Sequence, residues 1–164
     1  PTHGGSLRVY GCHAMDSRDI DHSVKEICRQ EKEAGLLVHR TYASFQDKVN
    51  AIKNGFLEFL LEKKRKNATV VAYGAAAKGN TLLNFAGVGP DLITCVFDAA
   101  QSKQNKYLPG SHIPILHPNN LKSMDCDAVI IFPWNIKDEL IPVIKSLTKP
   151  NTEIVTAIPE WCYH

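Results

Sequence analysis

The spacing of apolar residues changes near residue 67. In the first part of the chain, apolar residues recur every three or four positions, which predicts amphipathic helices over residues 16–34 and from about 44 to 66. From residue 68 onward, short β-branched runs alternate with segments of helical spacing. Strands are predicted at 69–73, 93–98, 113–116, 127–132 and 153–158, and helical segments at about 79–87, 118–123 and 137–148.

This alternation predicts an α/β fold with a Rossmann-like parallel sheet. Right-handed crossovers in a doubly wound topology give the strand order 3-2-1-4-5. A strand at about 5–12 and the two helices precede the sheet, so residues 1–67 are a strand with a helical connector and residues 68–164 are the Rossmann-like unit. In this topology the turns after the first and fourth strands lie side by side, where open α/β sheets bind their ligands.

Composition and charge narrow the classes of function. The 164 residues suit about one domain, and 44% hydrophobic with 22% charged residues is ordinary for a globular protein. No apolar run approaches the roughly 18 residues of a membrane span, so no membrane association is expected. The net charge of +2, without a basic stripe between aromatic residues, gives no indication of nucleic-acid binding. A small anionic ligand is compatible with this charge.

The five cysteines are widely spaced, at positions 12, 28, 95, 126 and 162. An odd, scattered set suits reduced thiols and predicts a cytoplasmic setting. Cys95 and Cys126 lie in apolar runs and are expected to act as small hydrophobic side chains. His112 and His117 are the best pair for a metal, but their spacing across Pro114 lacks helical geometry, so no metal site is predicted.

The stretch V-V-A-Y-G-A-A-A-K-G-N-T-L-L-N-F at residues 70–85 joins a strand, a turn of small residues and a helix start. Such a junction binds phosphate well, because free backbone N–H groups and the positive end of the helix dipole point at the turn. Asn80 stands where a P-loop has lysine, and Ala76 replaces the second glycine of the dinucleotide fingerprint. Alternatively, the small residues only let the helix pack close to the strand. The candidate ligand-binding residues are Gly74, Lys78, Gly79, Asn80 and Thr81.

Further candidates follow the later strands. Asp98 ends the second strand, where Rossmann folds often place an acid on a ribose hydroxyl, although a turn or cap residue is an equal alternative. Trp134 and Asn135 follow the fourth strand, where an indole beside an amide suits a base or sugar, unless Trp134 belongs to the core. Lys106 lies in the polar segment 101–112, which either contacts a diphosphate or is a solvated loop.

No reaction centre stands out in the sequence. There is no Ser/His/Asp order, pair of carboxylates or cluster of metal ligands, so no catalytic residue is predicted. The run Lys63–Lys66 is interpreted as a solvated helix end, because cations complement the dipole at a helix C-terminus. The residues therefore predict binding without an obvious reaction.

Four motifs occur in the order seen in a known family. They are H-G-G-S-L-R-V-Y at 3–10, Y-G-A-A-A-K-G-N-T-L-L-N at 73–84, K-Y-L-P-G-S-H-I-P-I at 106–115 and F-P-W-N at 132–135. Together they resemble the C-terminal region of the S-adenosylmethionine-dependent sugar C-methyltransferases. Enzymes of that family methylate a carbon of a keto-deoxysugar carried on a nucleoside diphosphate.

The resemblance implies that separate domains of a longer polypeptide have separate functions. A zinc-binding domain and a methyltransferase domain would precede this region, with residues 3–12 as the last strand of the methyltransferase domain. This agrees with the missing initial methionine and predicts that the chain is a fragment. S-adenosylmethionine and the proton-abstracting residues would belong upstream, so no cofactor is expected within this chain. The candidate residues would hold the nucleotide-diphosphate sugar, with the upstream methyltransferase domain as partner.

Two alternatives belong to other classes of function. The first is a non-catalytic regulatory module that senses a nucleotide with the same turn. The second is an NAD-binding oxidoreductase domain, which Asp98 favours and Ala76 disfavours.

Overall fold

The computed structural model describes residues 6–164. The chain divides into two compact units, Pro1–Val49 and Asn50–His164. In the first unit, α1 (His22–Glu33) begins after Asp21, whose carboxylate accepts a hydrogen bond of 2.8 Å from the Ser23 backbone N–H. The helix predicted over 16–34 therefore starts later than expected. The short helix α2 (His39–Ala43) was not predicted, and α3 (Phe45–Arg65) matches the second predicted helix.

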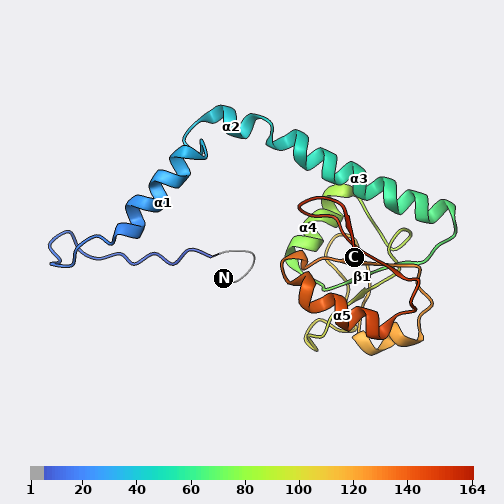
Figure 1. Ribbon diagram of the computed structural model, residues 1–164. Helices are drawn as coiled ribbons and strands as arrows, with labels where there is room; N and C mark the ends of the chain where they lie inside the picture. Colours follow the sequence, from blue (N-terminus) through green and yellow to red (C-terminus); the bar gives the residue numbers. More distant parts are fainter. Residues whose placement is uncertain (1–5) are drawn as a thin grey trace. The chain divides into compact units, whose positions relative to one another are not determined.

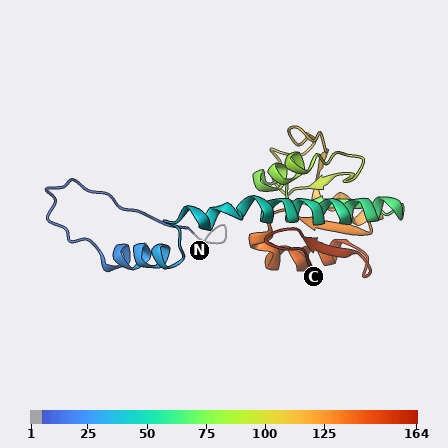
Figure 2. The ribbon, with the colours of Figure 1, turned by 90° about the horizontal axis from the view of Figure 1, so that it is seen from above.

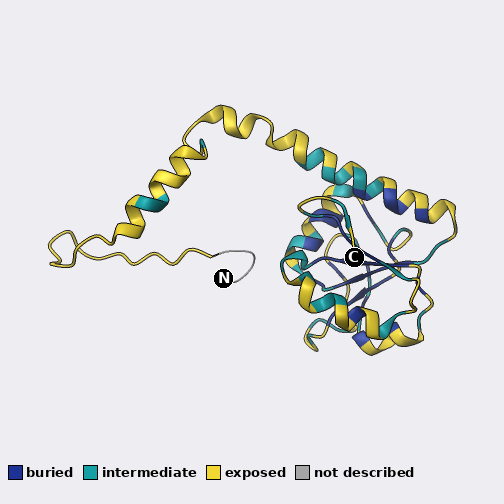
Figure 3. Ribbon diagram, in the orientation of Figure 1, coloured by how far each residue is buried: buried dark blue, intermediate teal, exposed yellow. Residues whose placement is uncertain are grey.

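The strand expected at about 5–12 is absent from the part of it that the structure describes. Residues 6–12 are exposed and belong to no β-ladder, and residue 5 lies outside the described residues. A strand needs a second strand to pair with its N–H and C=O groups, and no strand among the described residues pairs with residues 6–12. Within the first unit, residues 6–49 expose most of their side chains, which Figure 3 shows in yellow.

The second unit is built on a six-stranded sheet with the order β3-β2-β1-β4-β5-β6. This confirms the predicted parallel order 3-2-1-4-5 and adds one antiparallel strand at the edge beside β5. The strands are β1 (Val70–Tyr73), β2 (Val96–Phe97), β3 (Ile115–Leu116), β4 (Ala128–Ile131), β5 (Glu153–Thr156) and β6 (Cys162–Tyr163).

Helices cover both faces of this sheet (Figure 1). The connections are α4 (Ala77–Ala86), the short 3₁₀ helices η1 (Pro118–Ser123) and η2 (Trp134–Ile136), and α5 (Lys137–Leu147). The part of α3 beyond Asn50 also packs on the sheet, and Figure 2 shows it from above. The unit that holds the sheet therefore starts within α3.

The core has two layers because successive side chains of a strand point to opposite faces. On one face, Val70 and Ala72 of β1 pack with Phe56 of α3 and Leu83 of α4. On the other, Val71 and its same-face neighbours pack with Ile144 of α5, Leu121 of η1, Cys95 and Cys126. The three central strands β2, β1 and β4 are buried throughout, as a sheet covered on both faces requires (Figure 3).

The buried titratable side chains of the second unit include Cys95, Cys126 and Lys63. Cys95 and Cys126 are buried as predicted, and burial raises the pKa of Cys95 to about 12 and also raises the pKa of Cys126. The interpretation of Lys63 as part of a solvated helix end was wrong. Its side chain is buried, lies 5.2 Å from the centroid of the Phe59 ring, and donates a hydrogen bond to the Glu153 carboxylate. The apolar stripe of α3 turns Lys63 toward the sheet, while Lys64, Arg65 and Lys66 stay exposed.

Within residues 6–164, none of the helices has both the length and the apolar character needed to cross a membrane.

Candidate functional site

The turn between β1 and α4 (residues 74–76, the β1–α4 turn) lies at the carboxyl edge of the sheet. Tyr73 at the end of β1 pairs with Phe97 of β2 and with Ile131 of β4, so these three strands end together. The segment that follows β4, residues 132–136, therefore adjoins the β1–α4 turn. This is the switch point predicted from the sequence.

The N-terminus of α4 offers free backbone donors at this edge. Its N-cap residue, Ala76, has no side-chain oxygen to cap the helix, and its own N–H donates to the Gly74 carbonyl at 2.8 Å. The first intrahelical hydrogen bond runs from the Asn80 N–H to the Ala76 carbonyl. The N–H groups of residues 77–79 therefore have no intrahelical acceptor and carry the positive end of the helix dipole.

Two glycines let the β1–α4 turn and α4 approach the segment after β4 very closely. Gly74 has a φ of 89°, and a Cβ atom placed on it would lie 2.4 Å from Cδ of Pro133. A Cβ atom on Gly79 would lie 2.4 Å from Cγ of the Phe132 ring. Both positions fit the alternative in which small residues allow close packing. That packing also brings the two halves of the site together.

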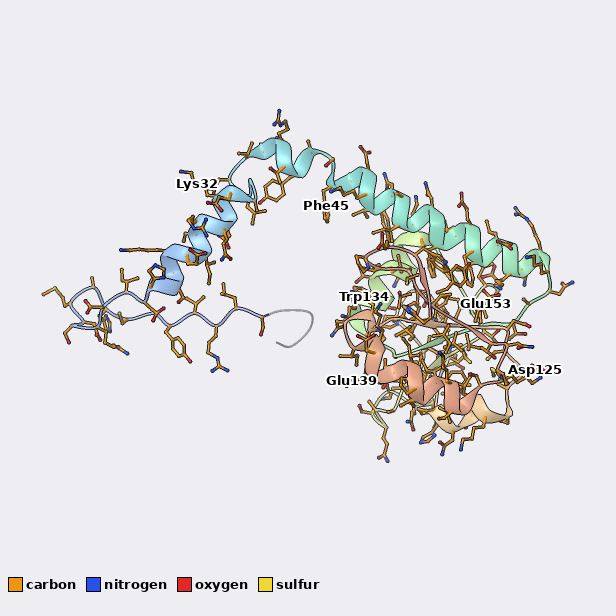
Figure 4. The ribbon with its side chains drawn as sticks, in the orientation of Figure 1. Lys32, Phe45, Asp125, Trp134, Glu139 and Glu153 are labelled. Carbon is orange, nitrogen blue, oxygen red and sulfur yellow. The ribbon has the colours of Figure 1, made fainter. Side chains whose placement is uncertain are left out.

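The close approach places Lys78 against the residues that follow β4. Its ammonium lies 4.4 Å from the centroid of the Trp134 ring and donates a hydrogen bond to the Asn135 side-chain oxygen. All three side chains are partly exposed, so they remain accessible to a ligand. Figure 4 shows Trp134 at the end of the sheet where α5 begins, opposite Asp125 and Glu153. The structure thus joins three of the predicted site residues in one cluster, the Lys78 cluster.

Asp98 is close to this edge, but its carboxylate is engaged by the chain. One oxygen accepts the Ala75 N–H at 2.7 Å and the Lys103 ammonium at 3.1 Å, and the other accepts the Ala100 N–H at 2.8 Å. The residue is 8% exposed. Its negative charge also raises the pKa of Tyr73, although burial of the phenol is the larger cause.

The remaining predicted residues are not drawn into the Lys78 cluster. Asn80 lies in the first turn of α4, and its side-chain oxygen is buried with no hydrogen-bond partner among the described residues. Thr81 is exposed and donates to the Ala77 carbonyl at 3.1 Å. Lys106 is exposed and donates to the Ser102 carbonyl at 2.7 Å.

Sequence reasoning missed the residue that fastens the segment 101–112 to α4. The Asn84 side-chain amide donates to the Pro109 carbonyl at 3.0 Å and to the Asn80 carbonyl at 2.9 Å. Gly110 follows with a φ of 83°, and a Cβ atom there would lie 2.0 Å from the Asn84 side-chain oxygen. The only feature of the sequence that could have indicated this contact is Asn84 itself, which lies one helical turn after Asn80.

His112 and His117 do not form a metal site with their surroundings. Across residues 6–164, no three His, Cys, Asp or Glu side chains gather closely enough to hold a metal ion. The His117 ring nitrogen instead accepts the Asn119 N–H at 3.1 Å and caps η1.

Comparisons with known proteins agree with the motifs in the sequence. A family model described as the C-methyltransferase C-terminal domain matches residues 1–159. The chain is also 31% identical over 158 residues to C-methyltransferase NovU from Streptomyces niveus. The matched region is 96% of this chain and 38% of NovU, so the chain spans well under half the length of this relative.

Proposed function

The chain belongs to the C-methyltransferase C-terminal domain family, and we propose that it holds the nucleoside diphosphate of a keto-deoxysugar during methyl transfer. The methylation itself belongs, in this proposal, to an upstream methyltransferase domain of the same polypeptide. Two things support the proposal: the family, and the way that the Lys78 cluster joins the two turns at the switch point of the sheet.

The Lys78 cluster carries the proposal because its groups suit a nucleotide. A lysine ammonium has three donors, and among residues 6–164 only Asn135 accepts a hydrogen bond from Lys78, so two donors remain for phosphate oxygens. The N–H groups of residues 77–79 add donors and the dipole end of α4, a combination that favours anions. The Trp134 ring offers a face for a base or sugar.

The other predicted residues have smaller parts in this proposal. Gly74 and Gly79 allow the close approach that forms the cluster. Asn80 and Thr81 lie on the first turn of α4, and the buried oxygen of Asn80 is an acceptor for a sugar hydroxyl if the side chain turns outward. Lys106 would contact the ligand from the segment 101–112.

Holding the nucleotide has a chemical purpose in a carbon methylation. Removal of a proton next to a ketone gives an enolate, and the methyl donor must then be in line with that carbon. Binding energy from the remote nucleotide keeps the sugar at the upstream active site when substrate is scarce. A domain without catalytic residues can therefore lower KM, and so raise the rate below saturation, without changing kcat.

S-adenosylmethionine does not fit the described residues of this chain. A Rossmann-like cofactor site uses an acid at the end of the second strand to bind ribose, and here the Asp98 carboxylate already accepts three hydrogen bonds from the chain. The same argument disfavours the NAD-binding alternative. We therefore place the methyl donor in the upstream domain.

Steady-state kinetics of the full-length enzyme test this proposal. Lys78→Met should raise KM for the nucleotide sugar about tenfold, the loss of roughly one charged hydrogen bond, and leave kcat nearly unchanged. Lys122→Met, an exposed lysine on η1, is the matched control and should change neither constant. An unchanged KM in Lys78→Met would overturn the assignment of the cluster to the substrate.

A further inference from the structure

The β1–α4 turn is held by a pair of charged side chains from another part of the chain. Ala75 is buried at 8% exposure and belongs to no strand or helix, so its N–H and C=O groups need other partners. The Asp98 carboxylate accepts the N–H at 2.7 Å, and the Lys103 ammonium donates to the C=O at 3.0 Å. The two side chains also pair with each other at 3.1 Å.

Lys103 lies in the segment 101–112, and Asp98 makes further hydrogen bonds to this connection between β2 and β3. The Gln104 side-chain amide donates to the Asp98 carbonyl at 2.9 Å, and the Ala100 N–H donates to the Asp98 carboxylate. At its far end the segment is fastened to α4, because Asn84 donates to the Pro109 carbonyl. The connection between β2 and β3 therefore makes hydrogen bonds to both ends of one region. This region consists of the β1–α4 turn and α4.

We propose that Asp98 and Lys103 are positioning residues that set the β1–α4 turn for ligand binding and do not themselves contact the ligand. This role rests in part on the proposed function, since the ligand is the nucleotide held by the Lys78 cluster. Lys78 lies in the first turn of α4, directly after the β1–α4 turn. A shift of that turn therefore moves the lysine and the free N–H groups of residues 77–79 relative to Trp134.

The geometry favours positioning over direct contact for Asp98. Its carboxylate is buried, and each of its oxygens already accepts a hydrogen bond from a backbone N–H. A ribose hydroxyl would have to displace one of these bonds. Lys103 is more exposed, with 44% of its side chain accessible, yet its ammonium bonds both Asp98 and the Ala75 carbonyl. The ion pair thus satisfies the buried backbone of the turn.

The test combines two measurements on Lys103→Met, which keeps the length of the side chain and removes its charge. In the 164-residue chain, amide hydrogen exchange at residues 74–76, whose N–H groups are hydrogen-bonded, should become at least several-fold faster. In the full-length enzyme, KM for the nucleotide sugar should rise about three- to tenfold with kcat nearly unchanged. Lys103→Arg keeps the charge and the donors, so it should restore both values. Asp98→Asn should speed exchange in the same way, and Lys122→Met is the control that should not.

The outcomes separate this inference from the proposed function. A raised KM in Lys103→Met with unchanged amide exchange would mean that Lys103 contacts the ligand directly, and this would overturn positioning. Unchanged exchange with an unchanged KM would also overturn it. If Lys78→Met leaves KM unchanged, the proposed function fails, and the exchange data still decide whether the pair holds the turn.

Discussion

Gly79 in the first turn of α4 lies directly against Phe132 after β4, so close that a methyl group on Gly79 would come within 2.4 Å of the ring. The backbone of α4 at Gly79 therefore packs directly against the side chain of Phe132. Lys78, the residue before this glycine, reaches the neighbouring turn and lies over Trp134. A packing glycine thus determines where the cation of the candidate site lies.

This contact gives a prediction about stability with an unusual sign. Gly→Ala inside a helix normally stabilises by roughly 0.5–1 kcal/mol. We expect Gly79→Ala to destabilise by about 1–3 kcal/mol instead, because the methyl group would overpack the Phe132 ring. Gly55→Ala in α3 is the matched control: its added methyl group meets nothing within 4 Å and should stabilise. Urea unfolding of both variants measures the difference, and a stabilised Gly79→Ala would contradict the packing.

The buried Cys95 thiol gives a prediction about pH. Its pKa is raised from 9.0 to about 12, chiefly by burial, so the folded protein keeps a proton that the unfolded chain releases. The stability that the neutral, buried thiol gives to the folded protein is fully present below pH 9. It is lost as the pH rises from 9 to about 12. The free energy of unfolding should fall there by up to about 1.4 kcal/mol per pH unit.

Cys95→Val isolates this effect, because it keeps the volume and apolar character of the side chain. The variant should lose stability less steeply with pH than the parent, although Cys126, whose pKa is also raised, still contributes. Denaturant unfolding at about pH 8 and about pH 10.5 gives the two slopes. Equal slopes for parent and variant would argue against a thiol buried in its neutral form.

The ion pair between Lys63 and Glu153 is expected to matter more than the exposed pairs on the helices. Only 10% of the Lys63 side chain is accessible, against 39% of the Glu153 side chain. Glu153→Gln should therefore cost about 1–3 kcal/mol, because a mostly buried ammonium loses its counter-charge. Glu62→Gln breaks the exposed pair with Lys66 and should cost at most about 0.5 kcal/mol. Equal losses, measured by chemical unfolding, would show that Lys63 is solvated in solution.

The sequence predicted the sheet well because its signal is local. Each parallel strand carries an apolar, β-branched run, and helices follow β1, β3 and β4, so topology rules then fix the order. The two-residue strand β6 (Cys162–Tyr163) has too short a run to show a pattern. The first segment, at 6–12, has an alternating pattern but finds no partner strand in the described chain.

The roles of individual side chains were harder to predict because they depend on distant partners. The sequence of Lys63–Lys66 does not reveal that Lys63 reaches Glu153, 90 residues away. For Asp98, a ribose ligand and a turn both require a carboxylate at the same position. The structure shows which backbone groups that carboxylate meets. The close packing at Gly74 and Gly79 likewise depends on Pro133 and Phe132, whose positions the local sequence does not give.

The edge formed by α4 and the turn after β4 is the proposed binding site for a nucleoside diphosphate. The most direct test is an NMR titration of the ¹⁵N-labelled 164-residue chain with thymidine diphosphate, in parallel with the Lys78→Met variant. We expect the largest shifts at the backbone amides of residues 77–79 and at the Trp134 indole N–H, with much weaker shifts in the variant. No shifts at millimolar ligand, or shifts confined to other parts of the chain, would contradict binding at this edge.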